Sequence, residues 1–364
     1  MSSRPRSREV LFRTLLVCGS LLVGLVVLEL GVRIVDAGPR GSLTDWHNVI
    51  RQDRVFTRDY TKARARYDAA LGFTGTPNYS VEGFHYDANG FRVTPAPAGA
   101  ALAEPPILAV GGSYTLGDEV ADDETFPSQL QALTGRRTIN AGMEAYGLDQ
   151  MVLRAEVVAA QDRPAAIVLS FGADNLRRTE MSRVWGVEKP YFTLTDGKLV
   201  LRNAPVPPSP DPATTLDIWQ RLFGRSLLVD LVLRHFGWQY EWSVDHVRVL
   251  PREEGVKLSC PLFKRLSQIG VPTIVAAEYD PYLWTDPPYM KEQNALTDAV
   301  LRCAEAAGFV IVNPFNAIDQ GMRTAGRDLY YRKGEHPSPA GHALAAKMVA
   351  DALKRFDLQA KAKP

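Results

Sequence analysis

The sequence lacks the features that would assign it quickly to a nucleic-acid-binding or metal-binding class. Its 364 residues carry 42 Lys and Arg against 41 Asp and Glu, so the formal net charge is only +1. No basic patch is interleaved with aromatic residues, which argues against a nucleic-acid partner. The histidines are few and scattered, without metal-ligand spacing. We therefore expect no metal and no cofactor.

Motifs of two common enzyme classes are also missing. The chain contains no GxSxG, which excludes the nucleophile elbow of α/β-hydrolases as a motif. A phosphate loop of the Walker type would need Lys followed by Ser or Thr after Gly117. This chain instead has Asp118 and Glu119, which would repel phosphate. We find no internal repeat.

One long apolar run lies near the N-terminus. Residues 14–36 are about long enough to cross a bilayer. Four arginines precede the run: Arg4, Arg6, Arg8 and Arg13. Their position predicts a cytoplasmic tail over 1–13 and an exported body. A cleaved signal peptide is the alternative, since Val35 and Ala37 fit a cleavage site before Gly38, but the run exceeds a usual signal core and favours an uncleaved anchor.

Cysteine is scarce, with three residues in the chain. Cys18 lies within the apolar run, and Val17 precedes it where a lipoprotein signal would have a small residue. Cys260 and Cys303 fall in the exported part, where a disulfide can persist. The sequence does not supply the geometry, so a disulfide and two buried thiols both stay open.

The body alternates short apolar runs with helical patterns, which predicts an α/β fold with a parallel sheet covered on both faces. The expected strands are 107–110, 138–142, 166–172, 273–279 and 309–314. Residues 37–104 are expected to form a membrane-proximal spacer and a small β-rich lead-in, and 105–364 the main domain. An insertion over 176–258 contains a predicted hairpin at 191–203 and an apolar helical stretch at 227–236. It could select substrate, or it could simply cap the sheet or pack against the membrane-proximal lead-in.

The most informative motif is GGSYTLGDE at 111–119. It follows the apolar strand 107–110, and its two glycines allow a sharp turn that delivers Ser113 to the carboxyl edge of the sheet. A serine hydroxyl needs a base to act as a nucleophile at neutral pH. HPSPAGH at 336–342 offers His336, on a loop before a helix that Ser338 and Pro339 would begin. His342, inside that helix, is expected to pack against the sheet.

Four blocks in this chain order resemble the SGNH (GDSL-like) hydrolase superfamily, particularly its membrane-anchored bacterial branch. They are GGSYTLGDE, INAGMEAYGLDQ at 139–150, SFGADN at 170–175 and HPSPAGH. The resemblance covers most of the chain after about residue 67, beginning with LGFTGTPN and NGFR. It implies a three-layer, flavodoxin-like fold with a mainly parallel five-stranded sheet, beside the N-terminal transmembrane helix. It also implies a serine esterase with no cofactor.

The resemblance implies an oxyanion hole made by the N–H groups of Ser113 and Gly142 and by an asparagine of the third block. The family spacing puts that asparagine at 174, where this chain has Asp174 followed by Asn175. An ionised Asp174 would oppose the developing negative charge. We expect Asn175 to point inward; the alternatives are a hole of two backbone donors, or residues that merely cap the next helical turn.

The acid that orients His336 is also uncertain. The family has an aspartate three residues before the histidine, where this chain has Lys333, which cannot accept the imidazole N–H. Glu335 is the first candidate and Asp328 the second. A backbone carbonyl in a Ser–His dyad is the remaining alternative.

The residues and the resemblance together predict a membrane-anchored, exported serine esterase that works through an acyl-enzyme. Family analogy suggests short acyl esters on an envelope or exported glycan as substrates, with a single pass through the bacterial inner membrane and a periplasmic catalytic domain. Hydrolysis and acyl transfer are not separated. Two alternatives are a non-catalytic envelope protein that keeps the fold for binding or assembly, and a membrane-proximal lipase or thioesterase.

Overall fold

The computed structural model describes residues 6–44, 64–97, 99, 101–208, 216–236, 238, 242–333 and 335–361. The chain divides into two compact units. One contains Met1–Val55 and Pro210–Val247, and the other contains Phe56–Ser209 and Arg248–Pro364. The insertion predicted at 176–258 is thus shared between the units, because only its middle part belongs to the first. Part of the predicted spacer, at 45–63, lies outside the described residues.

The second unit is built on a five-stranded sheet with the order β14-β13-β7-β5-β6. All four pairings are parallel. The strands are β5 (Ala103–Val110), β6 (Arg136–Asn140), β7 (Ala166–Phe171), β13 (Thr273–Ala277) and β14 (Val310–Val312). The predicted strands all fall in this sheet, which confirms the α/β, flavodoxin-like fold class.

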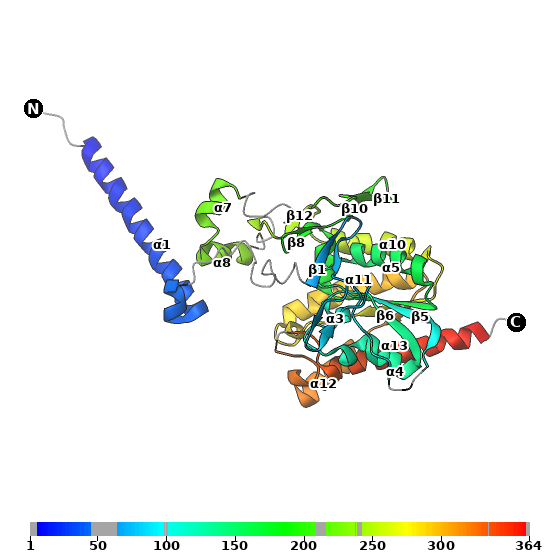
Figure 1. Ribbon diagram of the computed structural model, residues 1–364. Helices are drawn as coiled ribbons and strands as arrows, with labels where there is room; N and C mark the ends of the chain where they lie inside the picture. The colour runs from blue at the N-terminus through cyan, green and yellow to red at the C-terminus, as the bar shows by residue number, and fades with distance from the viewer. Residues whose placement is uncertain are drawn as a thin grey trace, which may run out of the picture. The chain divides into compact units, whose positions relative to one another are not determined.

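Helices cover both faces of this sheet (Figure 1). On one face lie α4 (Phe126–Thr134) and α13 (Pro339–Lys361), which contact each other. On the other lie α5 (Leu148–Asp162), α10 (Glu254–Ser267) and α11 (Pro287–Ala306). The remaining helical segments of this unit are α3 (Ser113–Leu116), η1 (Asp122–Glu124), α6 (Ala173–Thr179), η3 (Pro281–Trp284), α12 (Phe315–Ala325) and η4 (Arg327–Leu329).

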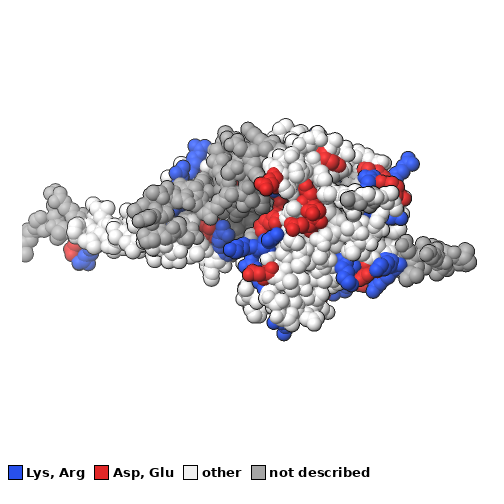
Figure 2. Space-filling view, turned by 60° about the horizontal axis from the view of Figure 1, so that its bottom comes forward, with Lys and Arg blue, Asp and Glu red and all other residues white. Residues whose placement is uncertain are grey.

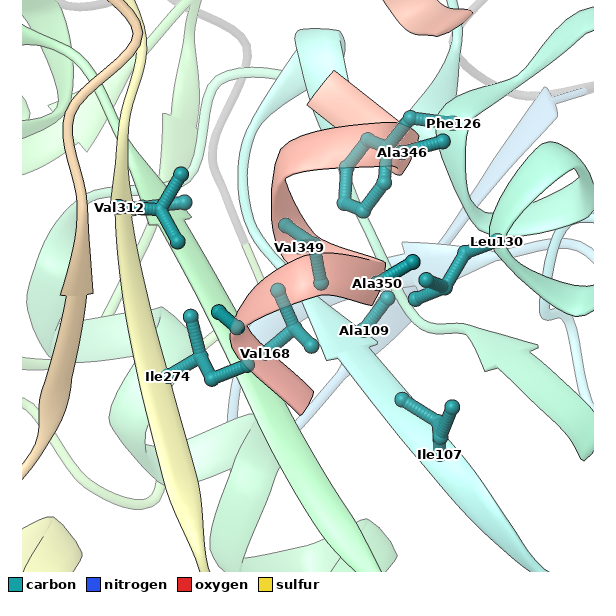
Figure 3. Packing of buried hydrophobic residues seen from close by; sticks show 12 residues of the cluster. Ile107, Ala109, Phe126, Leu130, Val168, Ile274, Val312, Ala346, Val349 and Ala350 are labelled. Atoms are coloured by element: carbon teal, nitrogen blue, oxygen red, sulfur yellow. The ribbon is translucent and has the colours of Figure 1, made fainter. Parts of the chain in front are cut away.

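The core under α4 and α13 is formed by side chains that alternate along the strands (Figure 3). Ile107, Val168 and Ile274 of the sheet share one buried cluster with Phe126 of α4 and Ala346 of α13. All five are at most 3% exposed. Small residues on α13 let that helix lie close to the sheet, so the loop that precedes it is held in a fixed place.

The second unit also contains short strands outside the main sheet. In the lead-in β1 (Ala65–Asp68) pairs with β2 (Gly72–Gly75), and β3 (Ser80–Val81) with β4 (Phe84–His85). Within the insertion, β10 (Tyr191–Thr195) and β11 (Lys198–Arg202) form the predicted hairpin, whose turn residues Asp196 and Gly197 both have positive φ. The other strands are β8 (Met181–Val184), β9 (Val187–Glu188) and β12 (Val247–Arg248).

The first unit contains the long helix α1 (Arg6–Thr44). Its stretch Glu9–Val35 is long and apolar enough to cross a membrane, judged by length and composition. The helix therefore starts before and ends after the predicted span at 14–36. This unit also contains α7 (Ile218–Phe223) and α8 (Leu227–His235) of the insertion.

Cys260 of α10 and Cys303 of α11 form a disulfide. This settles the choice that the sequence left open. The bond links two helices on the same face of the sheet and closes a separation of 43 residues. Cys18 is a free cysteine and is exposed.

Candidate active site

Ser113 is the first residue of α3, immediately beyond the carboxyl end of β5. Gly111 makes this turn possible, because a Cβ at that position would lie 1.9 Å from Oγ1 of Thr115 and 2.9 Å from the carbonyl oxygen of Ser170. The Ser113 hydroxyl is half-buried and has no hydrogen-bond partner among the described residues. A serine placed in this way can approach an ester carbonyl.

Gly142 does not take the role that the resemblance implies. Its N–H donates to Oδ1 of Asn140 at 3.1 Å, so that hydrogen is already engaged. A Cβ at Gly142 would lie 2.4 Å from the backbone nitrogen of Leu116 in α3. The glycine is therefore required for close packing beneath the serine helix, and the structure differs from the sequence prediction at this residue.

Ala145, which the sequence analysis missed, has the properties expected of an oxyanion donor. It has a φ of +61°, in the left-handed region that an alanine adopts only at a cost in energy. Its N–H has no partner within the described part of the chain. The segment lies beside the serine turn, because the N–H of Met143 donates to the carbonyl oxygen of Gly111 at 3.1 Å. The strained backbone leaves an N–H unused close to Ser113.

Asn175 points inward and Asp174 points away. The Asn175 side chain is buried, and its Nδ2 would lie 2.9 Å from a Cβ placed on Gly112, the residue before the serine. Its Oδ1 accepts from the N–H of Gly172 at 2.7 Å, and its Nδ2 donates to the carbonyl oxygen of Tyr146 at 2.8 Å. These bonds fix the amide with one Nδ2 hydrogen left over. The exposed Asp174 carboxylate pairs with Arg177 and Arg178.

His336 lies on the loop between η4 and α13, and its ring packs edge-on against Tyr114, with centroids 5.5 Å apart. Nδ1 of the ring is 3.1 Å from Oε1 of Glu119. Two acids of the serine block therefore lie beside the imidazole: Glu119 at Nδ1, and Asp118, whose Oδ2 is 3.9 Å from Nε2. No hydrogen bond joins His336 to Ser113 in the described part of the chain. Catalytic hydrogen bonds of this kind often tighten only when substrate is bound.

The two acids proposed from the sequence do not contact His336. The Glu335 carboxylate accepts a hydrogen bond from the hydroxyl of Tyr282, and its backbone carbonyl accepts one from Tyr114 at 2.9 Å. Glu335 has a φ of +80°, and its side chain is thus directed to Tyr282. Asp328 is exposed on η4. Neither candidate acid therefore contacts the imidazole, which lies beside Glu119 and Asp118 instead.

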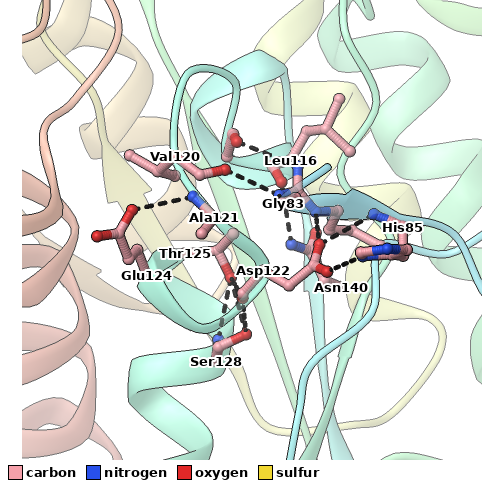
Figure 4. Close-up of polar contacts among 12 residues, drawn as sticks. Gly83, His85, Leu116, Val120, Ala121, Asp122, Glu124, Thr125, Ser128 and Asn140 are labelled. Atoms are coloured by element: carbon pink, nitrogen blue, oxygen red, sulfur yellow. Dashed lines mark hydrogen bonds and ion pairs between the residues drawn. The ribbon is translucent and has the colours of Figure 1, made fainter. Parts of the chain in front are cut away.

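The loop that carries Glu119 is held by a polar network around Asp122 (Figure 4). Nε of Arg92 donates to Oδ1 of Asp122, and its Nη2 donates to the carbonyl oxygen of Val120 at 2.9 Å. Asp122 also contacts His85 of β4. The Asp122 carboxylate is buried and paired. The lead-in thus fixes the position of Glu119, whose φ is +67°.

Negative charge collects around the loop of His336. Burial raises the pKa of Glu335, and the charges of Asp280, Glu119 and Asp174 raise it further. Acidic side chains also gather together on the face of the molecule drawn in Figure 2. Asp118 is neutralised by Arg64, with which it forms an ion pair. A field of this sign disfavours anionic groups near the imidazole.

Two further titratable side chains, His342 and Glu278, line a cavity of about 50 Å³. His342 accepts the N–H of Phe126 through Nδ1 at 3.1 Å, and burial lowers its pKa to about 3. It is a neutral core residue, as the sequence predicts. Burial raises the pKa of Glu278 to about 8, while a hydrogen bond from Oγ1 of Thr115 acts in the opposite direction.

Glu278 is expected to make the protein less stable as the pH rises. Its pKa is about 8 in the folded chain against an ordinary value of 4.5, so the folded state binds the proton more tightly. The free energy of unfolding then falls between these two pH values, by at most about 1.4 kcal/mol per pH unit. Glu278→Gln should flatten this fall, measured by urea unfolding across the range. Parallel pH profiles for the variant and the parent would contradict the assignment.

No family model matches the sequence, and no curated protein matches it. Solved structures are similar to this chain at low identity. LAE5, described as an alpha/beta hydrolase enzyme from the metagenome of Lake Arreo, has 14% identity and a TM-score of 0.44, covering 70% of this chain and 96% of its own. The esterase EstA from Pseudoalteromonas sp. has 14% identity and a TM-score of 0.40, covering 70% and 98%. A variant of the acetyl xylan esterase Axe2 from Geobacillus stearothermophilus has 13% identity and a TM-score of 0.42, covering 69% and 94%.

Proposed function

We propose that this chain is a membrane-anchored serine esterase of the SGNH type, acting on short acyl esters through an acyl-enzyme. The observation that carries the proposal is the surroundings of Ser113. Its hydroxyl is unengaged at the start of α3, with the unused N–H of Ala145 and the fixed amide of Asn175 close to the same turn. A hydroxyl without a hydrogen-bond partner can attack a carbonyl carbon, and nearby donors with a free hydrogen can bind the oxyanion that forms.

In the proposed reaction, Oγ of Ser113 attacks the ester carbonyl carbon and its proton passes to the imidazole of His336. The ester carbonyl oxygen becomes an oxyanion, held by the N–H groups of Ser113 and Ala145 and by Nδ2 of Asn175. These donors are already in place, so little reorganisation accompanies the development of charge. Glu119 holds Nδ1 of the imidazole and stabilises the imidazolium that forms.

Collapse of the tetrahedral intermediate breaks the bond to the leaving alcohol, which receives the proton from His336. The acyl group then sits on Ser113 as an ester. A water molecule or an acceptor hydroxyl attacks this ester with the same base and the same donors, and regenerates the serine. Hydrolysis and transfer thus share every protein group and differ only in the acceptor.

We infer the location and the substrate from α1 and from the charge of the site. A single pass through the bacterial inner membrane, with the four N-terminal arginines in the cytoplasm, would put the α/β unit in the periplasm. Acylated envelope or exported glycans are esters available there. Because acidic side chains surround the His336 loop, an uncharged acyl group and acceptor fit better than anionic ones.

A fluorophosphonate probe tests the proposal directly, because it reacts only with a serine that a base activates. The folded full chain in detergent is expected to take up one label, and peptide mapping should locate it on Ser113. Ser113→Ala should take up none. Absence of labelling in folded parent protein would overturn the esterase proposal in favour of a non-catalytic envelope protein.

A further inference from the structure

The insertion carries an exposed apolar surface on α7, on α8 and at Trp238. We call these side chains the insertion surface, and each is between 44% and 62% exposed: Ile218, Trp219, Leu222, Phe223, Leu231, Val232, Phe236 and Trp238. Neither α7 nor α8 has a buried residue. Packing among the described residues therefore does not account for the apolar character of these helices. Contiguous exposed apolar surface usually marks a contact with a membrane or a protein.

Aromatic rings are prominent on the insertion surface. Trp219 stacks on Phe223 with centroids 6.1 Å apart, and Phe236 stacks on Trp238 at 5.1 Å. Tryptophan is enriched where a protein meets the boundary between lipid headgroups and acyl chains, because its ring is apolar and its N–H is polar. The composition of this surface therefore favours lipid over a second protein.

The position of α8 relative to α1 supplies the independent argument. Glu29 of α1 accepts hydrogen bonds from the start of α8: from Oγ of Ser226 at 2.7 Å and from the N–H groups of Leu227 and Leu228 at 3.0 Å each. Arg33 donates to Glu29 at 2.7 Å and also bonds a backbone carbonyl of the same segment. The first turn of α8 is thus attached to α1 at Glu29.

This attachment fixes the depth of α8 once α1 crosses a bilayer. Glu29 lies six residues before Val35, the last residue of the apolar stretch, which corresponds to about 9 Å along a helix. Since the hydrocarbon core needs only about 20 residues, Glu29 falls near its outer boundary. The start of α8 must then lie at the same level, and polar partners from α8 offset the cost of placing Glu29 there.

We propose that the insertion surface binds the outer leaflet of the lipid bilayer beside α1, with α8 lying at the headgroup boundary. The inference rests on the membrane anchor of the proposed function. Helices that lie in this plane bury their apolar face into the boundary region. The chain then contacts the membrane through the insertion as well as through its span.

The test uses full-length protein in phosphatidylcholine vesicles, with Cys18→Ser as background and a fluorophore on a single introduced cysteine. Leu222→Cys reports on the insertion surface and Val23→Cys on the middle of the span. Leu133→Cys on α4 is the matched control, because Leu133 and Leu222 are both exposed leucines, at 59% and 62%. Quenchers are a nitroxide-bearing lipid and aqueous iodide.

The labels at positions 222 and 23 should lose most of their fluorescence to the lipid nitroxide, and the label at 133 only to iodide. If the label at position 222 is quenched only by iodide, like the label at 133, while lipid quenches the label at 23, the anchor stands and this inference is overturned. Protection of 222 from both quenchers would mean that protein covers the surface, which also overturns it. If lipid does not quench 23, the anchor itself is wrong, while fluorophosphonate labelling still judges the esterase separately.

The attachment can be tested in the same Leu222→Cys background. Glu29→Ala removes the acceptor for the three donors at the start of α8, and should raise iodide quenching at position 222 several-fold. Glu9→Ala is the matched control, because Glu9, near the other end of α1, pairs with Arg13 alone among the described residues. An equal response to both substitutions would contradict the role of Glu29.

Discussion

Ser113→Ala is expected to lower kcat for a short-chain aryl ester by about six orders of magnitude. Without the hydroxyl there is no atom on which the acyl group can be carried, and removing the nucleophile of a serine hydrolase costs about this much. KM should change little, because the donors around the turn stay in place. Steady-state kinetics with the parent and the variant in the same detergent measure both quantities.

The same substitution should leave the folded state almost unchanged. The Ser113 hydroxyl has no hydrogen-bond partner among the described residues, so its removal leaves no buried polar group without one. Thermal unfolding should therefore occur at nearly the same temperature. Ser267→Ala is the control. Ser267 is the last residue of α10, and its hydroxyl donates to the carbonyl oxygen of Lys264 in the same helix. Activity that survives in Ser113→Ala would show that another residue is the nucleophile.

The sheet could be predicted from the sequence because its strands are short, apolar and separated by helical patterns. Both faces of a parallel sheet are covered by helices, so side chains on either face are buried. Strand residues such as Ile107 and Val168 therefore stand in continuous apolar runs. The order of the blocks then places Ser113, Asn175 and His336 at one edge, since parallel strands share their carboxyl ends. The broad plan of the site follows from that rule alone.

The oxyanion donors were harder to predict because backbone conformation is not visible in residue type. The resemblance implies Gly142 as an oxyanion donor, yet in the structure this glycine allows close packing against α3. Ala145 adopts the left-handed conformation that glycine would normally mark, so no residue type pointed to it. The order Asp174–Asn175 could be resolved only by the direction of each side chain, which the bonds of Asn175 fix.

The acids that contact His336 come from the serine block and not from the residues near the histidine in sequence. Glu335 is adjacent to His336 in sequence, but its side chain reaches Tyr282 instead. Glu119 is 217 residues from His336 in the sequence and lies on the loop after α3. Its position depends on Arg92 of the lead-in, and such long-range polar contacts leave no periodic pattern in a sequence.

The division of the insertion was equally hidden. Its hairpin β10–β11 follows from a local turn signal at Asp196 and Gly197, which needs only neighbouring residues. The attachment of α8 to Glu29 joins segments about 200 residues apart through a capping interaction. From the sequence, the Glu29 carboxylate in an apolar helix could reach the membrane interface or pair with a nearby cation. Nothing in the sequence indicates that it binds the N-terminus of another helix.

Glu119→Gln is expected to lower kcat by about four orders of magnitude, because a neutral amide neither selects the productive tautomer of His336 nor stabilises its imidazolium. His336→Ala should cost nearly as much as loss of the serine. Steady-state kinetics of both variants beside the parent measure these losses.

Three further variants separate Glu119 from the acids suggested by chain distance. Glu335→Gln and Asp328→Asn should each keep most of the activity, because neither carboxylate contacts His336 in the structure. Lys333→Asp, which restores the family's usual acid, should add little while Glu119 holds Nδ1. Combined with Glu119→Gln, however, Lys333→Asp supplies the only acid at the family position, and partial recovery of kcat is expected. Full activity in Glu119→Gln, with a severe loss in Glu335→Gln, would return the orienting role to Glu335 and refute the contact seen here.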